Sequence, residues 1–271
     1  MIKQAIIPLA GLGTRLLPLT SVFAKELLPI NGRPGIEYIL DECIDAGIKE
    51  IIFIISSRKL MIKKYFYSDK FYKNIIKNKK DSRIINEYKK LLKYKKKIKF
   101  VFQNIPKGTG DAVLKTQKYI KNKYFLMLLP DDLIIKKNCS KAMIKVHKKY
   151  QASVMASMKV KKNNVTRWGI YKINKKLNKR DKIIDGVVEK PSVKNAPSNN
   201  AVIGRYILPR TIFKKIKSLN PTKGKEIHIT DAIQLLINDK EKFVAHNFDG
   251  KYLDCGTMSG YINSSKQIGK I

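Results

Sequence analysis

Acidic residues are scarce in this sequence. It has 21 aspartates and glutamates against 57 lysines and arginines, a formal net charge of +36 over 271 residues. A field of that sign attracts polyanions, so by itself it would favour nucleic acid or an anionic membrane as a partner. The lysines are, however, spread along the chain among Ile, Asn and Tyr, and no zinc-finger or aromatic RNA-binding signature accompanies them. We therefore expect solvated lysine faces and no specific nucleic-acid partner.

Cysteines and long apolar runs are also scarce. The three cysteines, Cys43, Cys139 and Cys255, lie far apart without CxxC spacing, which predicts neither a disulfide framework nor a zinc site. No stretch is long enough to span a bilayer, and Pro8 breaks the opening apolar run, unlike the apolar region of a signal peptide. We expect a cytoplasmic protein with no membrane partner.

The apolar residues that are present begin with a strand–helix–strand pattern. Residues 2–7 are rich in Ile and predict a strand that leads into a glycine loop. Apolar residues then recur at helical spacing from Ile36 to Ile44, and Gly47 is placed to end that helix in a left-handed conformation. The continuously apolar run EIIFII at 50–55 is typical of a parallel strand covered by helices on both faces.

The rest of the chain extends this pattern into an α/β fold. Lysine-rich segments between 57 and 97 keep one apolar stripe and predict a peripheral helical arm. A strand at 98–102, a helix over Thr109–Ile120 and a strand at 124–130 follow, and alternating β-branched strands dominate the second half. We expect a Rossmann-like mixed, mainly parallel sheet flanked by helices, in a single domain over 1–271.

Two features would meet at the carboxyl ends of the strands, where open parallel sheets bind ligands. One is the glycine loop, in which Gly11 and Gly13 would let backbone amides approach a phosphate and Arg15 would add a charged contact. The other is the acidic pair at 131–132, which follows an apolar strand. The loop lacks the GK[ST] ending of a P-loop. It also lacks the third glycine of GxGxxG, and that absence disfavours a dinucleotide-dependent oxidoreductase.

A longer motif gives the chain a family resemblance. The segment PLAGLGTRLLPLTSVFAKELLPINGRP joins the glycine loop to Lys25, and it resembles the sugar-1-phosphate nucleotidylyltransferases, which couple nucleoside triphosphates to sugar 1-phosphates. The segments LLPDDLI, VVEKP, APSNNAVIGRYIL, EIHITDAI and YLDCGT, with the helical arm, resemble the bacterial branch that uses UTP and glucose 1-phosphate. The resemblance covers essentially the full length. It implies formation of UDP-glucose and pyrophosphate by in-line attack.

The resemblance also implies site residues. Asp131 and Asp254 would hold Mg²⁺, a hard ion that takes oxygen ligands and shares them with substrate phosphates. The catalytic cations would be Arg15, Lys25 and Lys190. The N-terminal half would bind the nucleotide, with Gln103 at the uracil edge, through Ala10, Gly11, Gly13, Thr14, Arg15, Gln103 and Gly108. The C-terminal half would bind the sugar phosphate through Gly169, Glu189, Lys190 and Val202.

Two departures from the family pattern lie near these residues. The family's GLGHA is GTGDA here, with Asp111 in place of a histidine, and TKAIPKE is TSVFAKE, with Ser21 in place of a lysine. Both changes reduce the positive potential near the phosphates. The alternatives are an enzyme of the same fold that uses dTTP or ATP, and a basic nucleic-acid-binding protein on a decayed enzyme scaffold. The arm also makes a homodimer or homotetramer an expectation.

Overall fold

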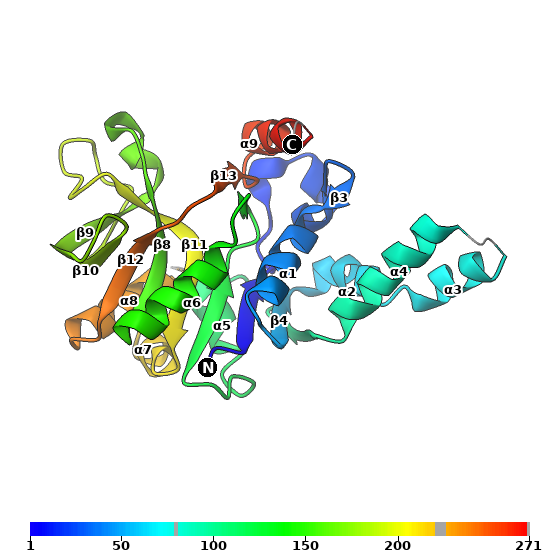
Figure 1. Ribbon diagram of the computed structural model, residues 1–271, viewed down its shortest axis with the longest axis horizontal. Coiled ribbons are helices and arrows are strands. Elements are labelled where there is room, and N and C mark those ends of the chain that lie inside the picture. Colours follow the sequence, from blue (N-terminus) through cyan, green and yellow to red (C-terminus); the bar gives the residue numbers. More distant parts are fainter. Residues whose placement is uncertain (79–80, 220–225, 270–271) are drawn as a thin grey trace.

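One nine-stranded sheet runs through both halves of the chain (Figure 1). The computed structural model describes residues 1–78, 81–219 and 226–269. The strand order is β5-β4-β1-β6-β11-β8-β12-β10-β9. In chain order these strands are β1 (Gln4–Pro8), β4 (Glu50–Ile55), β5 (Ile98–Phe102), β6 (Tyr124–Leu128), β8 (Ser153–Lys159), β9 (Gly169–Lys176), β10 (Asp181–Glu189), β11 (Asn200–Pro209) and β12 (Phe243–Asn247).

The N-terminal half of the sheet is parallel, as its apolar strands predict. β4 pairs in parallel with β1 and with β5, and β1 pairs in parallel with β6. The sheet becomes mixed at β11, which is antiparallel to both β6 and β8. Two small antiparallel ladders lie apart from it: β2 (Pro29–Ile30) with β3 (Arg33–Pro34), and β7 (Asp132–Ile135) with β13 (Lys251–Asp254). The predicted mixed α/β fold is confirmed, with parallel pairing throughout its N-terminal half and mostly antiparallel pairing in its C-terminal half.

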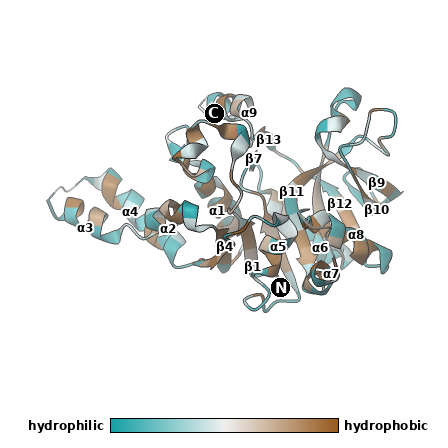
Figure 2. Ribbon diagram, turned by 180° about the vertical axis from the view of Figure 1, so that it is seen from behind, coloured by the Kyte–Doolittle hydropathy of each residue, from teal (hydrophilic) through white to brown (hydrophobic). Residues whose placement is uncertain are grey.

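Helices cover both faces of the sheet, and each face has its own core. Apolar side chains of one face pack with α1 (Gly35–Asp45), α2 (Leu60–Phe66), α4 (Ser82–Lys95) and α6 (Cys139–Tyr150). Those of the other face pack with α5 (Gly108–Leu114), α7 (Ile212–Ser218) and α8 (Ile229–Asn238). Figure 2 shows this distribution as hydrophobic ribbon concentrated on the central strands. Burial on both faces explains why EIIFII is continuously apolar.

The remaining helices and turns lie at the edges of this body. α3 (Asp69–Asn78) and α4 form the arm, and α9 (Met258–Ile268) lies beside β2. Short 3₁₀ turns span Thr14–Leu16, Leu19–Ser21, Lys25–Leu27, Ser57–Lys59 and Lys162–Arg167. Within the described ranges, no helix is long and apolar enough to cross a membrane.

Helix ends test the sequence predictions closely. Gly47 follows α1 with φ +88°, so the predicted left-handed ending is confirmed. The helix predicted over Thr109–Ile120 is α5, and it ends at Leu114. Beyond it, Thr116 Oγ1 donates to the carbonyl of Val113 at 2.6 Å and the backbone continues in tight turns. A hydroxyl that bonds locally to the backbone competes with helical hydrogen bonding.

The lysine-rich segment is an arm of helices, as predicted (Figure 1). Asp81 caps α4 by accepting from the Arg83 amide at 2.8 Å. The rings of Tyr72 and Tyr88 stack with centroids 5.7 Å apart, which joins α3 to α4. Figure 2 shows both hydrophobic and hydrophilic ribbon along the two helices, in keeping with one apolar stripe on each.

Candidate active site

Two adjoining pockets lie at the carboxyl ends of the parallel strands. The loop pocket, of about 290 Å³, is lined by Pro8, Ala10, Gly11, Arg15, Lys25, Glu26, Gln103, Pro106, Gly108, Thr109, Ala112, Leu129, Pro130, Asp131 and Glu226. The strand pocket, of about 500 Å³, is lined by Arg15, Leu129, Asp131, Asp132, Arg167, Trp168, Gly169, Glu189, Lys190, Val202, Gly204, Tyr206, Thr230, Tyr252, Asp254 and Thr257. They share Arg15, Leu129 and Asp131, and so form one crevice with a junction at Asp131.

The glycine loop forms one wall of this crevice. Gly13 has φ +74°, and its carbonyl accepts from Thr20 Oγ1 at 2.9 Å. A side chain at Gly11 would meet nothing within 4 Å, so the backbone there is open to a ligand. Arg15 extends from the turn that follows, with its side chain 69% exposed. An open backbone beside an unburied guanidinium suits a phosphate.

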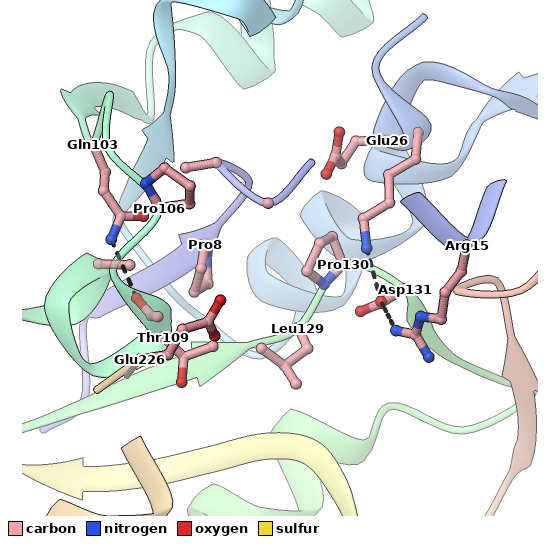
Figure 3. A pocket seen from close by; sticks show the side chains of 15 residues that line it. Pro8, Arg15, Glu26, Gln103, Pro106, Thr109, Leu129, Pro130, Asp131 and Glu226 are labelled. Carbon is pink, nitrogen blue, oxygen red and sulfur yellow. Dashed lines mark hydrogen bonds and ion pairs between the residues drawn. The ribbon is translucent and has the colours of Figure 1, made fainter. Parts of the chain in front are cut away.

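Lys25 and Asp131 form the ion pair at the junction. Lys25 Nζ lies 2.8 Å from Asp131 Oδ2, and Arg15 lies 3.7 Å from the same oxygen (Figure 3). Burial alone would lower the pKa of Lys25, but the charges of Asp131 and Glu26 raise it above its usual value. Burial would likewise raise the pKa of Asp131, but Lys25 and Arg15 lower it. Both groups are therefore charged at neutral pH.

A buried network supports Asp132, the neighbour of Asp131. Its Oδ2 accepts from the Gly204 amide at 2.8 Å and its Oδ1 from the Tyr252 hydroxyl at 2.7 Å. Burial, together with the charge of Asp131, raises the pKa of Asp132 to about 6. Arg205 lies behind it, fully buried, and donates to the Asp132 carbonyl at 2.6 Å. Asp132 thus holds the segment that follows β6 against the middle of β11.

Asp254 lies 123 residues after Asp131 in the sequence, and the ladder of β7 and β13 brings it to the junction. Asp254 lies opposite Asp132 in that ladder, and the Cys255 amide donates to the Asp131 carbonyl at 2.8 Å. A Cβ on Gly256 would lie 2.9 Å from Asp131 Oδ2 and 3.3 Å from Asp254 Oδ1. The two carboxylates therefore face a common space that the missing side chain of Gly256 leaves open.

Oxygen donors at this junction suit a hard divalent cation. Two carboxylates fit an ion that keeps several waters and shares its remaining positions with phosphate oxygens. Among residues 1–78, 81–219 and 226–269, no group of three or more His, Cys, Asp or Glu side chains forms a closed metal cluster. The three cysteines are free and buried.

Gln103 lies at the opposite end of the loop pocket from Asp131 (Figure 3). It follows β5, is 5% exposed, and its Nε2 donates to Gly108 O at 3.2 Å and to Asp111 Oδ2 at 2.7 Å. Gly108 has φ +93°, and a Cβ there would lie 2.5 Å from the carbonyl oxygen of Ile227. This contact requires glycine at position 108. The two residues form a polar end to the pocket.

The strand pocket gathers the other predicted residues. A Cβ on Gly169 would lie 3.0 Å from Glu189 Oε2 and 3.3 Å from Val202 Cγ2, so these three residues are in contact across β9, β10 and β11. Lys190 has φ +43°, and its amide donates to the Trp168 carbonyl at 3.0 Å. That left-handed residue turns the chain at the end of β10.

The structure thus brings nearly all predicted site residues to one crevice. Two are exceptions, because neither lines the two pockets: Gly13 lies behind the loop against Thr20 and Lys25, and Thr14 lines a neighbouring pocket with Lys59.

Sequence reasoning missed three groups. Glu26 is buried and accepts from Lys59 Nζ at 2.8 Å behind Lys25, Glu226 lines the loop pocket, and Tyr252 holds Asp132. Glu26 and Glu226 both lie within the motifs quoted above, and acidic residues are rare in this chain. That scarcity was the signal that could have singled them out.

A comparison with known proteins agrees with this site. The chain belongs to the nucleotidyl transferase family, which it matches over residues 4–271. It is 36% identical to the putative UTP–glucose-1-phosphate uridylyltransferase of Methanocaldococcus jannaschii, over 99% of this chain and 94% of that one.

Solved structures of two enzymes are also similar. A UDP-glucose pyrophosphorylase complexed with UDP-glucose superposes with a TM-score of 0.87 and 34% identity, covering 100% of this chain and 99% of that one. A UTP-bound enzyme of the same kind from Acinetobacter baumannii has a TM-score of 0.89 and 33% identity, covering 99% and 94%. These findings confirm the resemblance drawn from the motifs.

Proposed function

We propose that the protein transfers the uridylyl group of UTP to glucose 1-phosphate, giving UDP-glucose and pyrophosphate. The observation that carries this proposal is the double pocket with shared residues Arg15 and Asp131. One compartment has a glycine loop and a polar end for a nucleotide, and the other has hydroxyl-binding and cationic groups for a sugar phosphate. The names and bound nucleotides of the similar enzymes support the same reaction.

The nucleotide would occupy the loop pocket. Gln103 and Gly108 would contact the uracil, and the loop backbone at Ala10 and Gly11 would lie along the phosphates. Lys25 and Arg15 would face the α-phosphate and the departing pyrophosphate. Their charges lie where negative charge increases in the transition state, which is the arrangement that accelerates phosphoryl-type transfer.

The sugar phosphate would occupy the strand pocket. Glu189 would accept hydrogen bonds from sugar hydroxyls, Gly169 and Val202 would wall the ring, and Lys190 would bind the phosphate. A phosphate oxygen would then attack the α-phosphorus in line, since the two compartments meet at Asp131 and hold the reactants close together. No covalent enzyme intermediate is needed, because the phosphate itself is the nucleophile.

We assign the divalent cation to Asp131 and Asp254, and propose Mg²⁺. Their oxygens face the space beside Gly256, and the lowered pKa of Asp131 favours its ionised form. A bound Mg²⁺ would neutralise phosphate charge and orient the phosphates. Lys25, which now pairs with Asp131, would be free to contact phosphate when the cation balances that carboxylate.

Further proposals concern the setting of the enzyme. The nine-stranded sheet, which takes strands from both halves of the chain, supports one domain over 1–271, in which the two halves contribute the two compartments. The free, buried cysteines support a reducing, cytoplasmic setting. The arm of α3 and α4 projects from the body of the molecule (Figure 1), and we propose that it packs against a second copy in a homodimer or homotetramer.

Pyrophosphate release tests the reaction. Purified protein is assayed with glucose 1-phosphate, Mg²⁺ and each of UTP, dTTP, ATP, CTP and GTP, with and without Asp131→Ala. We expect preference for UTP and loss of turnover in the variant. Preference for dTTP or ATP would refute the uridylyl assignment but keep the mechanism. Absence of turnover with every nucleotide would refute the proposed reaction. Detection of a uridylylated protein would refute the direct mechanism.

A further inference from the structure

The amide of Gln103 is held by two hydrogen-bond acceptors. Its Nε2 donates to Asp111 Oδ2 at 2.7 Å and to the Gly108 carbonyl at 3.2 Å. An amide nitrogen has two hydrogens, so both are used by these contacts. Figure 3 shows this nitrogen directed at the start of α5. The carbonyl oxygen of the amide, Oε1, is therefore the group that the side chain can offer to a ligand in the loop pocket.

Asp111 allows only one of the two orientations of the Gln103 amide. A glutamine amide can exchange its oxygen and nitrogen by rotating half a turn, which costs little where its partners can both donate and accept. A carboxylate only accepts, so rotation would set Oε1 against an oxygen of Asp111 and another of Gly108. The Asp111 side chain is 10% exposed, so little water is present to relieve that repulsion.

The surrounding backbone holds both acceptors in place. The amide of Gly110 donates to Ile227 O at 2.7 Å, and Ile227 N donates to Lys107 O at 2.9 Å. Gly108 is packed so closely on Ile227 that a Cβ would lie 2.5 Å from its carbonyl oxygen. Gln103 is fixed from the other side, because its own amide donates to Ile55 O at 2.9 Å. Rearrangement of the backbone is therefore not an easy alternative to a fixed amide.

We infer that Asp111 is a positioning residue that selects the base by fixing Gln103 with its oxygen toward the nucleotide. An acceptor at that place pairs with the N3–H of uracil and repels cytosine, whose N3 is itself an acceptor. The inference rests on the proposed function, because that places the base in the loop pocket.

The test compares equilibrium binding of UTP and CTP to the full chain by isothermal titration calorimetry, with Mg²⁺ and without glucose 1-phosphate. Asp111→Asn keeps the size of the side chain but can offer either an oxygen or an NH₂ to Gln103. We expect the ratio of the CTP and UTP dissociation constants to fall at least tenfold, about 1.4 kcal/mol. If that variant does not fold, Asp111→Ser tests the same step, because a hydroxyl also both donates and accepts.

Two further variants separate positioning from structure. Gln103→Leu should reduce the ratio as well, and adding Asp111→Asn to it should change the ratio no further, because Asp111 acts through Gln103. Lys115→Met removes the charge 3.7 Å from Asp111 Oδ1 but leaves the carboxylate, and should keep the wild-type ratio. An additive effect of Asp111→Asn on Gln103→Leu would overturn the inference.

The outcomes also separate this inference from the proposed reaction. If Asp111→Asn weakens UTP and CTP binding equally, with the ratio within twofold of wild type, Asp111 is merely structural and the inference fails. A wild-type chain that binds CTP as tightly as UTP refutes it too. A chain that prefers UTP in binding and loses that preference in Asp111→Asn, yet makes no UDP-glucose, supports the inference and refutes the reaction.

Discussion

Lys25 is the residue on which the proposed chemistry depends most. It is largely buried, and its pKa is raised because Asp131 and Glu26 outweigh the effect of burial, so it stays an ammonium through neutral pH. Glu26 is in turn held by Lys59, 2.8 Å away. A cation fixed in this way has little reorganisation to undergo when charge develops on the phosphates, and this pre-organisation is what an electrostatic catalyst requires.

Replacing Lys25 by methionine should reduce kcat with UTP by about 10²- to 10³-fold, the usual cost of one lost transition-state contact. KM should change less, because the leaving pyrophosphate gains charge mainly in the transition state. Steady-state pyrophosphate release measures both constants. Lys141→Met, an exposed lysine on α6, is the matched control and should behave as wild type. A Lys25→Met enzyme within threefold of wild-type kcat would contradict the assigned role.

Two glycines of the site should respond differently to alanine. Gly108→Ala puts a side chain at φ +93° and 2.5 Å from the Ile227 carbonyl oxygen, so it should destabilise the fold by at least about 1–2 kcal/mol. Gly11→Ala meets nothing within 4 Å and should leave the stability unchanged. Urea unfolding monitored by circular dichroism measures both. Equal stability of the two variants would show that the Gly108 contact is relieved at no cost.

At the scale of elements, one buried ion pair joins α1 to the strands that carry the acidic pair. Arg205 on β11 is fully buried and donates to Glu42 on α1 at 2.9 Å, and also to the carbonyls of Leu129 and Asp132. Glu42 also accepts from the Ser140 hydroxyl at the start of α6 at 2.6 Å. The pair therefore connects three elements directly behind the junction of the two pockets.

Breaking that pair should cost more than replacing it. Glu42→Ala leaves the guanidinium of Arg205 buried without its counter-charge, and should destabilise the fold by about 3–5 kcal/mol. The double variant Glu42→Leu with Arg205→Met removes both charges and should recover part of that loss. Denaturant unfolding of the single and double variants decides the point. If the double variant is no more stable than Glu42→Ala, the unpaired charge of Arg205 is not the source of the cost.

Elements with a clear burial pattern could be predicted from the sequence, and those fixed by distant contacts could not. EIIFII and the helix from Gly35 were predictable because covered strands and one-sided helices have different apolar periods. The early end of α5 depended on a side-chain bond from Thr116. The place of β12 between β8 and β10 depended on pairings between residues 90 apart (Ser153 with Phe243) and 65 apart (Asp181 with His246), for which no local pattern exists.

The site residues also divide into those that could be predicted from the sequence and those that depend on distant contacts. Gly11 and Asp131 follow neighbouring parallel strands, so general rules for open sheets place them together. Asp254 reaches them only through the β7–β13 ladder, and resemblance alone indicated it. The contact between Gln103 and Asp111 links a strand end to a helix across a turn, and was visible in the sequence only as a departure from the family pattern.

At the scale of the whole molecule, the few acidic residues are concentrated in specific contacts. Within the described part of the chain, the buried ones are Glu26, Glu37, Glu42, Asp111 and Asp181. The surface is consequently even more cationic than the composition indicates, and acidification adds further positive charge to a chain already at +36. Stability in acid should therefore depend strongly on the buried carboxylates that stay ionised.

Asp181 is the carboxylate at which this dependence can be measured. Its Oδ1 lies 2.6 Å from His246 Nδ1, and although burial alone would raise its pKa, the bonds from His246 and Asn178 lower it. A carboxylate with a lower pKa in the folded than in the unfolded chain stabilises the fold above the unfolded value, near 3.9. That stability is lost as the pH falls through the folded value.

Asp181→Asn should therefore lower the Tm at pH 7, and the difference from wild type should shrink as the pH falls below about 3.9, because the unfolded chain then takes up a proton that the folded carboxylate resists. Thermal unfolding at fixed ionic strength, at pH 7, 5, 4 and 3, measures the difference. Asp249→Asn is the control, since that carboxylate is half-exposed and should contribute little at any pH. A difference from wild type that is constant across the range would mean that Asp181 stabilises the fold through shape and hydrogen bonding, and that its charge contributes nothing.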